Sequence, residues 1–252
     1  HLEIVQERLE REYDQTIIMT IPSVQYRFLL NSGEEIEVDN PHYYPDPMQI
    51  DTSEEPYVLA SILIPERSMG AVMNLCLERR GVNVKFNYPT PKRIELTAEM
   101  PLAEIIYDFY DKLKTVTQGY GSFDYEVIDY RKSDLVKLDI LVNGEKVDAL
   151  SMMIHRERAR PRALQICERL REEIPRNMFK IDIQGAVGGQ IIALSTVNAF
   201  RKDVTAKCYG GDITRKRKRL EKQKAGKKRM KMVGSVEIPQ SAFVSVLKSE
   251  HE

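Results

Sequence analysis

The sequence YVLASILIPERSMGAVMNLCLERRG, residues 57–81, decides the fold that we expect for the middle of the chain. Residues 57–64 are mostly apolar and read as a strand. Pro65 stands where the first residue of a helix would be, and apolar side chains recur at helical spacing from Met69 onward. Gly81 ends that pattern, as glycine often does at a helix C-terminus. The stretch therefore predicts a strand followed directly by a helix.

The residues that follow continue this alternation of strands and helices. We expect two strands joined by a proline-containing turn, a helix opened by Pro101 and broken at Gly119, and one more strand. The predicted ranges are 82–88, 93–99, 101–118 and 122–130. The order β-α-β-β-α-β is that of a ferredoxin-like domain. Its two helices would cover one face of a four-stranded antiparallel sheet.

The first fifty residues predict a truncated α+β domain. The expected elements are a helix over 1–13, a strand over 15–21, and a hairpin made by 23–30 and 35–38. These few elements can bury little apolar surface by themselves. We therefore interpret residues 1–50 as the back half of a larger domain. The chain opens on His1 inside a helical pattern, and we interpret it as a fragment of a longer protein. Four prolines in residues 39–56 predict a linker.

Residues beyond 134 predict a further domain of strands and helices. The expected elements are strands over 135–142 and 146–153, a helix over 162–173, strands over 179–186 and 191–195, and a helix over 241–248. Leu164, Cys167 and Leu170 would face inward from the first of these helices. Asn143-Gly144 predicts a hairpin turn. The pattern does not decide between helix and strand for residues 200–208.

The charge of the chain is unevenly distributed. The whole chain has a formal net charge of +0, but residues 214–231 contain eleven lysines and arginines and one acid, Glu221. A polyanion is the natural partner of such a segment, because each neutralised phosphate releases condensed counterions. We expect these cations on RNA phosphates: Arg215, Lys216, Arg217, Lys218, Arg219, Lys222, Lys224, Lys227, Lys228, Arg229 and Lys231. Phosphate contacts position a protein without reading sequence, so no sequence preference should follow.

The same segment predicts a helix that begins near Asp212 or Thr214, because good helix formers fill it. Leu220, Ala225 and Met230 are its only apolar residues, too few for a stripe that faces a core. We expect the helix to fray unless a partner binds it. A solvated tail without specific function is one alternative. A membrane-surface helix is another, but it would need an apolar face.

Several segments resemble known translation factors. TQGYGSF at residues 117–123 resembles the fifth domain of elongation factor G, and HLEI with RLEREY at residues 1–13 resembles the second helix of its third domain. The fourth domain of that factor is replaced here by a short linker. IDIQGAVGG (181–189), AKCYGGDITRK (206–216) and GKKRMK (226–231) resemble the C-terminal domain of the LepA (elongation factor 4) family. The resemblance implies three domains: 1–50, 51–133 and a basic RNA-binding domain over 134–252.

The resemblance also implies a function. LepA-type factors are translational GTPases that bind ribosomal RNA and tRNA and rearrange tRNAs on stalled or mistranslocated ribosomes by back-translocation. GTP and magnesium would belong to an N-terminal domain that this sequence lacks, because no GxxxxGK[ST] loop is present. The fragment itself should bind no cofactor and hydrolyse no GTP. The implied protein is a monomer in the cytoplasm, on the ribosome, with a pool peripherally associated with the inner membrane.

Other residues suggest little chemistry. Cys76, Cys167 and Cys208 have no metal-ligand spacing, and the four histidines are scattered, so we expect no metal site and no catalytic group. Acid pairs such as Glu54-Glu55 read as solvated. A second basic cluster, Arg156, Arg158, Arg160 and Arg162, would join the RNA surface or cap a loop.

The glycine clusters and one tyrosine leave alternatives open. Gly188-Gly189 reads as a turn between strands, not a dinucleotide loop. Gly210-Gly211 would hold a phosphate or merely break the backbone. Tyr209 would stack on a base or pack in a core. Two other functions remain: a stand-alone RNA-binding module, and a metabolic enzyme built on the ferredoxin-like domain.

Overall fold

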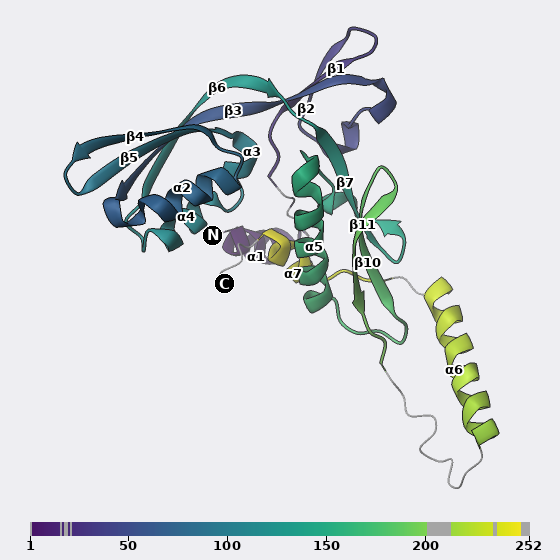
Figure 1. Cartoon of the computed structure of the whole chain (residues 1–252). Helices are drawn as coiled ribbons and strands as arrows, with labels where there is room; N and C mark the ends of the chain where they lie inside the picture. The colour runs from purple at the N-terminus through teal and green to yellow at the C-terminus, as the bar shows by residue number, and fades with distance from the viewer. Residues whose placement is uncertain are drawn as a thin grey trace. The chain divides into compact units, whose positions relative to one another are not determined.

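The computed structural model describes residues 2–15, 17, 20, 22–200, 213–233 and 236–247. It divides into two compact units, each described by itself below (Figure 1). The ferredoxin unit comprises Ile21–Lys137, Met152–Arg156 and Leu247–Glu252. The C-terminal unit comprises His1–Thr20, Leu138–Ser151 and Glu157–Val246. These units cut the chain differently from the predicted boundaries at residues 50 and 133, so the three-domain division stays a prediction.

The centre of the ferredoxin unit is an antiparallel sheet in the order β4-β5-β3-β6. Its strands are β3 (Ile50–Pro65), β4 (Val82–Thr90), β5 (Arg93–Pro101) and β6 (Ser122–Lys132). Helices α2 (Met69–Glu78), α3 (Leu102–Ile105) and α4 (Phe109–Val116) lie against one face of this sheet (Figure 1). Ile62, Leu96 and Phe109 are fully buried in the core of this unit. The α+β class and the ferredoxin-like order are therefore confirmed.

The sheet has six strands, so the prediction of four was incomplete. The hairpin of β1 (Tyr26–Leu30) and β2 (Glu35–Val38) joins it, because β1 pairs with β3 from Ile50 to Glu54. Strand β5 takes the same edge of β3 from Tyr57 onward. Pro56 lies between the two pairings on this edge, and on the other edge of β3 it stands opposite Tyr130 of β6.

This arrangement corrects the expected linker. Strand β3 begins at Ile50, and only residues 39–49 connect it to β2, through two short 3-10 turns at Pro41–Tyr43 and Pro47–Gln49. A second core holds the hairpin in place, with Tyr26, Phe28 and Met153 buried together. The Tyr26 hydroxyl donates to the Met153 carbonyl at 3.3 Å.

Two predicted helix boundaries were wrong. Pro65 is the last residue of β3 and precedes a 3-10 turn at Glu66–Ser68, so α2 begins only at Met69. The helix expected from Pro101 is split into α3 and α4. Asp108 lies at the break with a φ of −140°, and its buried carboxylate pairs with Arg79 at 2.5 Å.

The C-terminal unit contains part of a second antiparallel sheet, in which β10 (Ile181–Val187) lies between β7 (Leu135–Val142) and β11 (Gln190–Val197). Asn143 and Gly144 have φ of 53° and 88°, as a two-residue hairpin turn requires. The expected partner strand 146–153 is broken into β8 (Glu145–Lys146), a 3-10 turn (Asp148–Leu150) and β9 (Met152–His155). Gly188 and Gly189 form the turn between β10 and β11, which confirms that reading.

Helix α5 (Arg156–Glu173) begins earlier than predicted. Cys167 and Leu170 are buried as predicted, together with Ala163 and Ile166, whereas Leu164, also expected inside, is 40% exposed. Small residues let the helix approach the sheet closely: a Cβ on Gly185 would lie 2.7 Å from the Cβ of Ala163.

The remaining helices of this unit are α1 (Leu2–Tyr13), α6 (Ile213–Val233) and α7 (Gln240–Leu247). Helix α7 is held on α5 by the Ser241 hydroxyl, which donates to Glu173 at 2.8 Å. We expected a strand over residues 15–21. The structure describes Gln15, Ile17 and Thr20 of that range, and none of these three lies in a strand. Among the described helices, none is long and apolar enough to span a membrane.

Candidate nucleic-acid interface

Helix α6 carries the basic segment, as the sequence predicts. It runs without a break through Gly226, whose missing side chain faces open space. Its 21 residues correspond to a rod of roughly 30 Å at 1.5 Å per residue. Thr214, one of the two predicted caps, lies inside α6, which already includes Ile213. Asp212, the other predicted cap, and residues 200–208 beyond Phe200 lie outside the described residues. The same holds for Tyr209 and for Gly210-Gly211.

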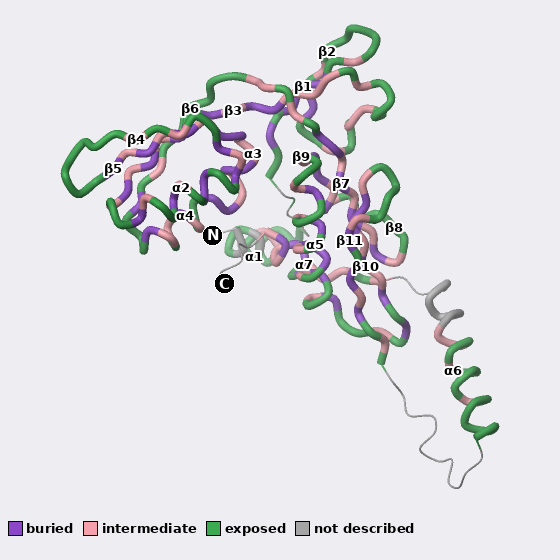
Figure 2. The backbone as a smooth tube through the Cα atoms, viewed as in Figure 1, coloured by how far each residue is buried: buried purple, intermediate pink, exposed green. Residues whose placement is uncertain are grey.

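The cationic side chains of α6 face solvent. Those classed as exposed are Arg215, Lys216, Arg217, Lys218, Lys222 and Lys224. Arg219 and Lys227 are half-buried. Lys228, Arg229 and Lys231 lie on the helix, but their side chains are not among the described ones. All eleven predicted residues thus lie on one helix, eight of them with described side chains, and the helix is exposed along most of its described length (Figure 2).

Four of these eight side chains, Arg215, Arg217, Arg219 and Lys227, interact with other residues of the chain. Arg217 pairs with Glu221 one turn away, with Nε and Oε1 3.2 Å apart. Lys227 donates to the Phe200 carbonyl at 3.0 Å. In the described part of the chain, the ammonium groups of Lys216, Lys218, Lys222 and Lys224 have no hydrogen-bond or ion-pair partner. Acidic side chains of the same chain paired with these four lysines would have argued against binding to an external anion. The described residues pair no such side chain with them.

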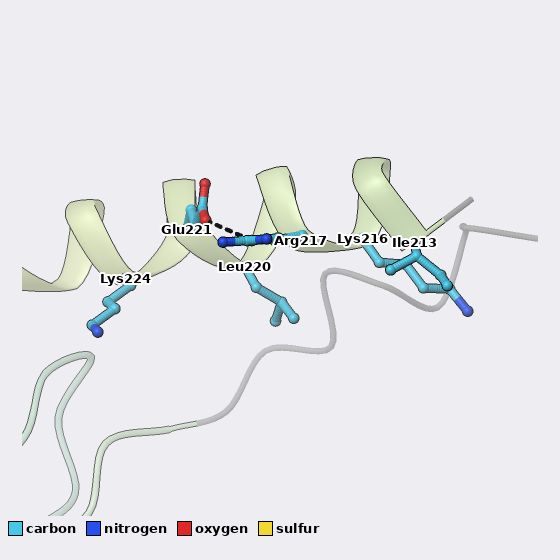
Figure 3. Close-up of a pocket in the computed structure, with 6 residues that line it drawn as sticks. All are labelled: Ile213, Lys216, Arg217, Leu220, Glu221 and Lys224. Atoms are coloured by element: carbon cyan, nitrogen blue, oxygen red, sulfur yellow. Dashed lines mark hydrogen bonds and ion pairs between the residues drawn. The ribbon is translucent and has the colours of Figure 1, made fainter. Parts of the chain in front are cut away.

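The helix has two different faces. At 100° per residue, Arg215, Lys218 and Lys222 fall on one side, which carries no large apolar residue between Ile213 and Lys227. The other side lines an open cavity of about 430 Å³ (Figure 3). Its lining consists of Ile213, Lys216, Arg217, Leu220, Glu221 and Lys224.

The second basic cluster does not form a comparable surface. Its members are two residues apart on α5, so successive side chains point about 200° from one another. Arg156 is held by Asp134, with two hydrogen bonds of 2.6 and 3.2 Å. Arg162 donates to the Gln165 side chain. Arg156 therefore fixes the N-terminal end of α5, whereas the Arg162–Gln165 contact lies within the helix.

One polar cluster was missed by sequence reasoning. Glu55, expected to be solvated, is 1% exposed and receives two hydrogen bonds from Arg80, at 2.6 and 3.0 Å. Arg80 also contacts Glu104 at 3.2 Å. Burial by itself would lower the pKa of Arg80, but the hydrogen bonds that Arg80 donates to Glu55, together with the charges of Glu55 and Glu104, outweigh it and the pKa is raised. Arg80 lies just after α2 in a left-handed turn (φ 60°), a position that glycine usually takes. An arginine at this position was the hint in the sequence that its side chain has a specific partner.

The TQGYGSF motif builds a second exposed surface, in the ferredoxin unit. The Thr117 hydroxyl accepts a hydrogen bond from the Gly121 amide at 2.9 Å and so closes the turn after α4. Tyr120 is left 67% exposed, with the Arg67 guanidinium 5.5 Å from its ring centre. Arg67 also donates to Gln118 at 3.2 Å. A cation beside an exposed ring suits RNA, but nothing here points to catalysis.

Among the described residues, no group of three or more histidine, cysteine or acidic side chains could hold a metal ion. Cys76 and Cys167 are buried, and burial raises the pKa of each thiol to about 12, with Glu168 adding to the effect at Cys167. Such thiols are neither nucleophiles nor ligands at neutral pH.

Comparison with known proteins matches nearly the whole chain. The family described as GTP-binding protein LepA C-terminus matches residues 142–248, and the one described as elongation factor G C-terminus matches residues 52–141. Elongation factor 4 of Syntrophobacter fumaroxidans is 75% identical over 252 residues, and that of Syntrophus aciditrophicus 70% over 250. These matches cover 100% and 99% of this chain. The chain spans 42% of the length of each relative.

Proposed function

Because the chain belongs to the LepA (elongation factor 4) family, we propose that it is the RNA-binding C-terminal part of a translation factor GTPase that acts on the ribosome. In this proposal the whole factor rearranges tRNAs on stalled or mistranslocated ribosomes. GTP and magnesium would be bound by a domain outside this sequence. This chain would supply contacts to ribosomal RNA and tRNA, and the factor would work as a monomer in the cytoplasm.

The observation that carries the proposal is the set of unmatched lysines on α6. Lys216, Lys218, Lys222 and Lys224 hold positive charge in water with no acid of the described chain against them. Such a helix gains little from packing on its own protein, because its only large apolar side chains in the described part are Ile213 and Leu220, both exposed. Released counterions make an RNA backbone the favoured partner.

The experiment that tests the proposal is a salt titration of ribosome binding. If the segment engages about seven phosphates of single-stranded or loop RNA, log affinity should fall against log salt with a slope near −5, at about 0.7 per contact. Replacing the five residues Arg215 to Arg219 with glutamine should weaken binding and reduce the slope by roughly 3. A variant with Lys92→Gln and Arg93→Gln, on the exposed β4–β5 turn, serves as the matched control. An unchanged slope in the five-residue variant would remove α6 from the interface.

A stand-alone RNA-binding module would also satisfy the geometry of α6. Such a module would need no GTPase domain. This chain spans 42% of the length of its relative from Syntrophobacter fumaroxidans, and this favours a factor with further domains. A membrane-associated pool has less support, because α6 has no continuous apolar face. Binding to vesicles with anionic headgroups, measured beside ribosome binding, would separate these partners.

A further inference from the structure

The cavity face of α6 has a composition that phosphate binding alone does not explain. Ile213 is 77% exposed and Leu220 is 51% exposed, and between Ile213 and Lys227 they are the only large apolar residues of the helix. They lie seven residues apart, which places them on nearly the same side of the helix, about 10 Å from each other. An exposed pair of large apolar side chains at this spacing marks a place where something apolar can pack.

Polar groups surround this apolar pair in a fixed arrangement. Arg217 lies between the two, and its guanidinium is held by Glu221 at 3.2 Å, beside the cavity (Figure 3). Lys216 and Lys224 lie toward the two ends of the same cavity, eight residues apart (Figure 3). The face therefore offers an apolar floor, a flat cation at its side and two lysines toward its ends.

We propose that this face binds an unpaired nucleotide of the RNA. The base would pack against Leu220 and Ile213, with the Arg217 guanidinium stacked on its plane. The neighbouring phosphates would meet Lys216 and Lys224. Glu221 is a positioning residue, because it holds Arg217 and contacts no phosphate. The inference rests on the proposed RNA binding and adds the class of RNA: single-stranded or loop segments in preference to duplex.

The preference follows from what each RNA form exposes. In an A-form duplex the bases are stacked inside and the major groove is too deep and narrow for side chains to read. Ile213 and Leu220 would then face charged phosphates, which gain nothing from an apolar surface. Unpaired bases have a free apolar plane, and packing on that plane tolerates any base.

An acidic protein segment is the other occupant that the charges would accept. A helix that docks in a groove uses apolar anchors at i, i+3, i+4 and i+7. The described part of α6 offers only two such large side chains, too few for a peptide helix. One base, by contrast, needs a single apolar floor with cations beside it.

The test compares single-stranded and duplex RNA on the full chain. Fluorescence anisotropy would measure binding of an RNA of about 12 nucleotides, without self-complementarity, and of the same strand in a duplex. Leu220→Ala should weaken single-strand binding roughly tenfold and duplex binding by less than about twofold, because it removes a base contact and no charge. The salt slope should not change. Leu220→Met, which keeps an apolar side chain of similar size, should restore binding.

Two further arms locate the base and the charges. A 2-aminopurine in the single strand should change in fluorescence with the wild-type chain, and that change should be absent with Leu220→Ala at saturation. Lys218→Gln, on the opposite face, should weaken both RNA forms alike and lower the salt slope. Both Leu220 and Lys218 are exposed on the helix, so circular dichroism should show all variants folded.

The outcomes are distinguishable. Equal loss for both RNA forms, or no loss, with Leu220→Ala would overturn the unpaired-nucleotide site and leave RNA binding by α6 standing. Failure of the wild-type chain to bind either RNA would overturn both proposals. An acidic amphipathic peptide whose binding depends on Leu220, when RNA binding does not, would assign the cavity to a protein partner.

Discussion

The substitution Glu55→Gln tests whether the buried ion cluster of the ferredoxin unit stabilises the fold. Glu55 is 1% exposed and accepts two hydrogen bonds from Arg80, whose side chain is 18% exposed. Glutamine keeps the shape but replaces one acceptor oxygen with an N–H₂ group that faces the guanidinium. The change therefore leaves a buried cation with Glu104 as its remaining partner, at 3.2 Å.

The expected cost follows from this geometry. Removing one partner of a buried ion pair costs about 3–5 kcal/mol, and the remaining Glu104 contact puts this case near the lower end. The free energy of unfolding should fall by about 3 kcal/mol, with a drop in Tm on the order of 10 °C. Glu54→Gln is the matched control, because the neighbouring residue of β3 points to the other face and its replacement should cost less than about 0.5 kcal/mol.

Urea denaturation followed by circular dichroism gives the free energy. Hydrogen exchange of peptides from β3 and α2 shows that the loss lies in this unit. A second variant, Arg80→Gly, relieves a left-handed conformation worth about 1–2 kcal/mol but leaves Glu55 unpaired. It should still destabilise, and the double variant should cost less than the sum of the two. Equal stabilities for Glu55→Gln and Glu54→Gln would refute the reasoning.

Gly185→Ala should destabilise the C-terminal unit by roughly 1–3 kcal/mol, because the new Cβ meets Ala163 at 2.7 Å. In Gly226→Ala the new Cβ meets nothing within 4 Å, so the substitution should raise the helicity of α6 and stabilise the helix by up to about 1 kcal/mol. A thermal melt of each variant should show a lower Tm for Gly185→Ala and no lower Tm for Gly226→Ala. Cys76 and Cys167 should resist iodoacetamide at neutral pH and react in urea, as peptide mass mapping would show. The pKa of each thiol is raised from 9.0 to about 12, so above pH 9 the folded chain keeps protons that the unfolded chain loses. The free energy of unfolding should therefore fall as the pH rises above about 9, by up to about 1.4 kcal/mol per pH unit for each thiol. Stability that is unchanged from pH 9 to 11 would contradict these shifts.

Local patterns determined much of this protein. The apolar spacing around residues 57–130 predicted the order β-α-β-β-α-β, which the sheet confirms. Asn143-Gly144 predicted a tight turn, because few other residues adopt positive φ so cheaply. The density of lysine and arginine predicted an exposed helix at α6. Each of these signals lies within a few residues of the structure that it specifies.

Only the tertiary structure decided which segments meet. The hairpin β1–β2 joins the edge of β3 through backbone hydrogen bonds, and backbone groups are the same in every residue, so the sequence carries no mark of that pairing. Glu55 looks solvated beside Glu54 until Arg80, 25 positions later, is folded against it. Asp108 lies at the break in a predicted helix, and its buried carboxylate pairs with Arg79, the residue that follows α2. A charge is stable when buried only if its partner is present, and that partner is a property of the fold.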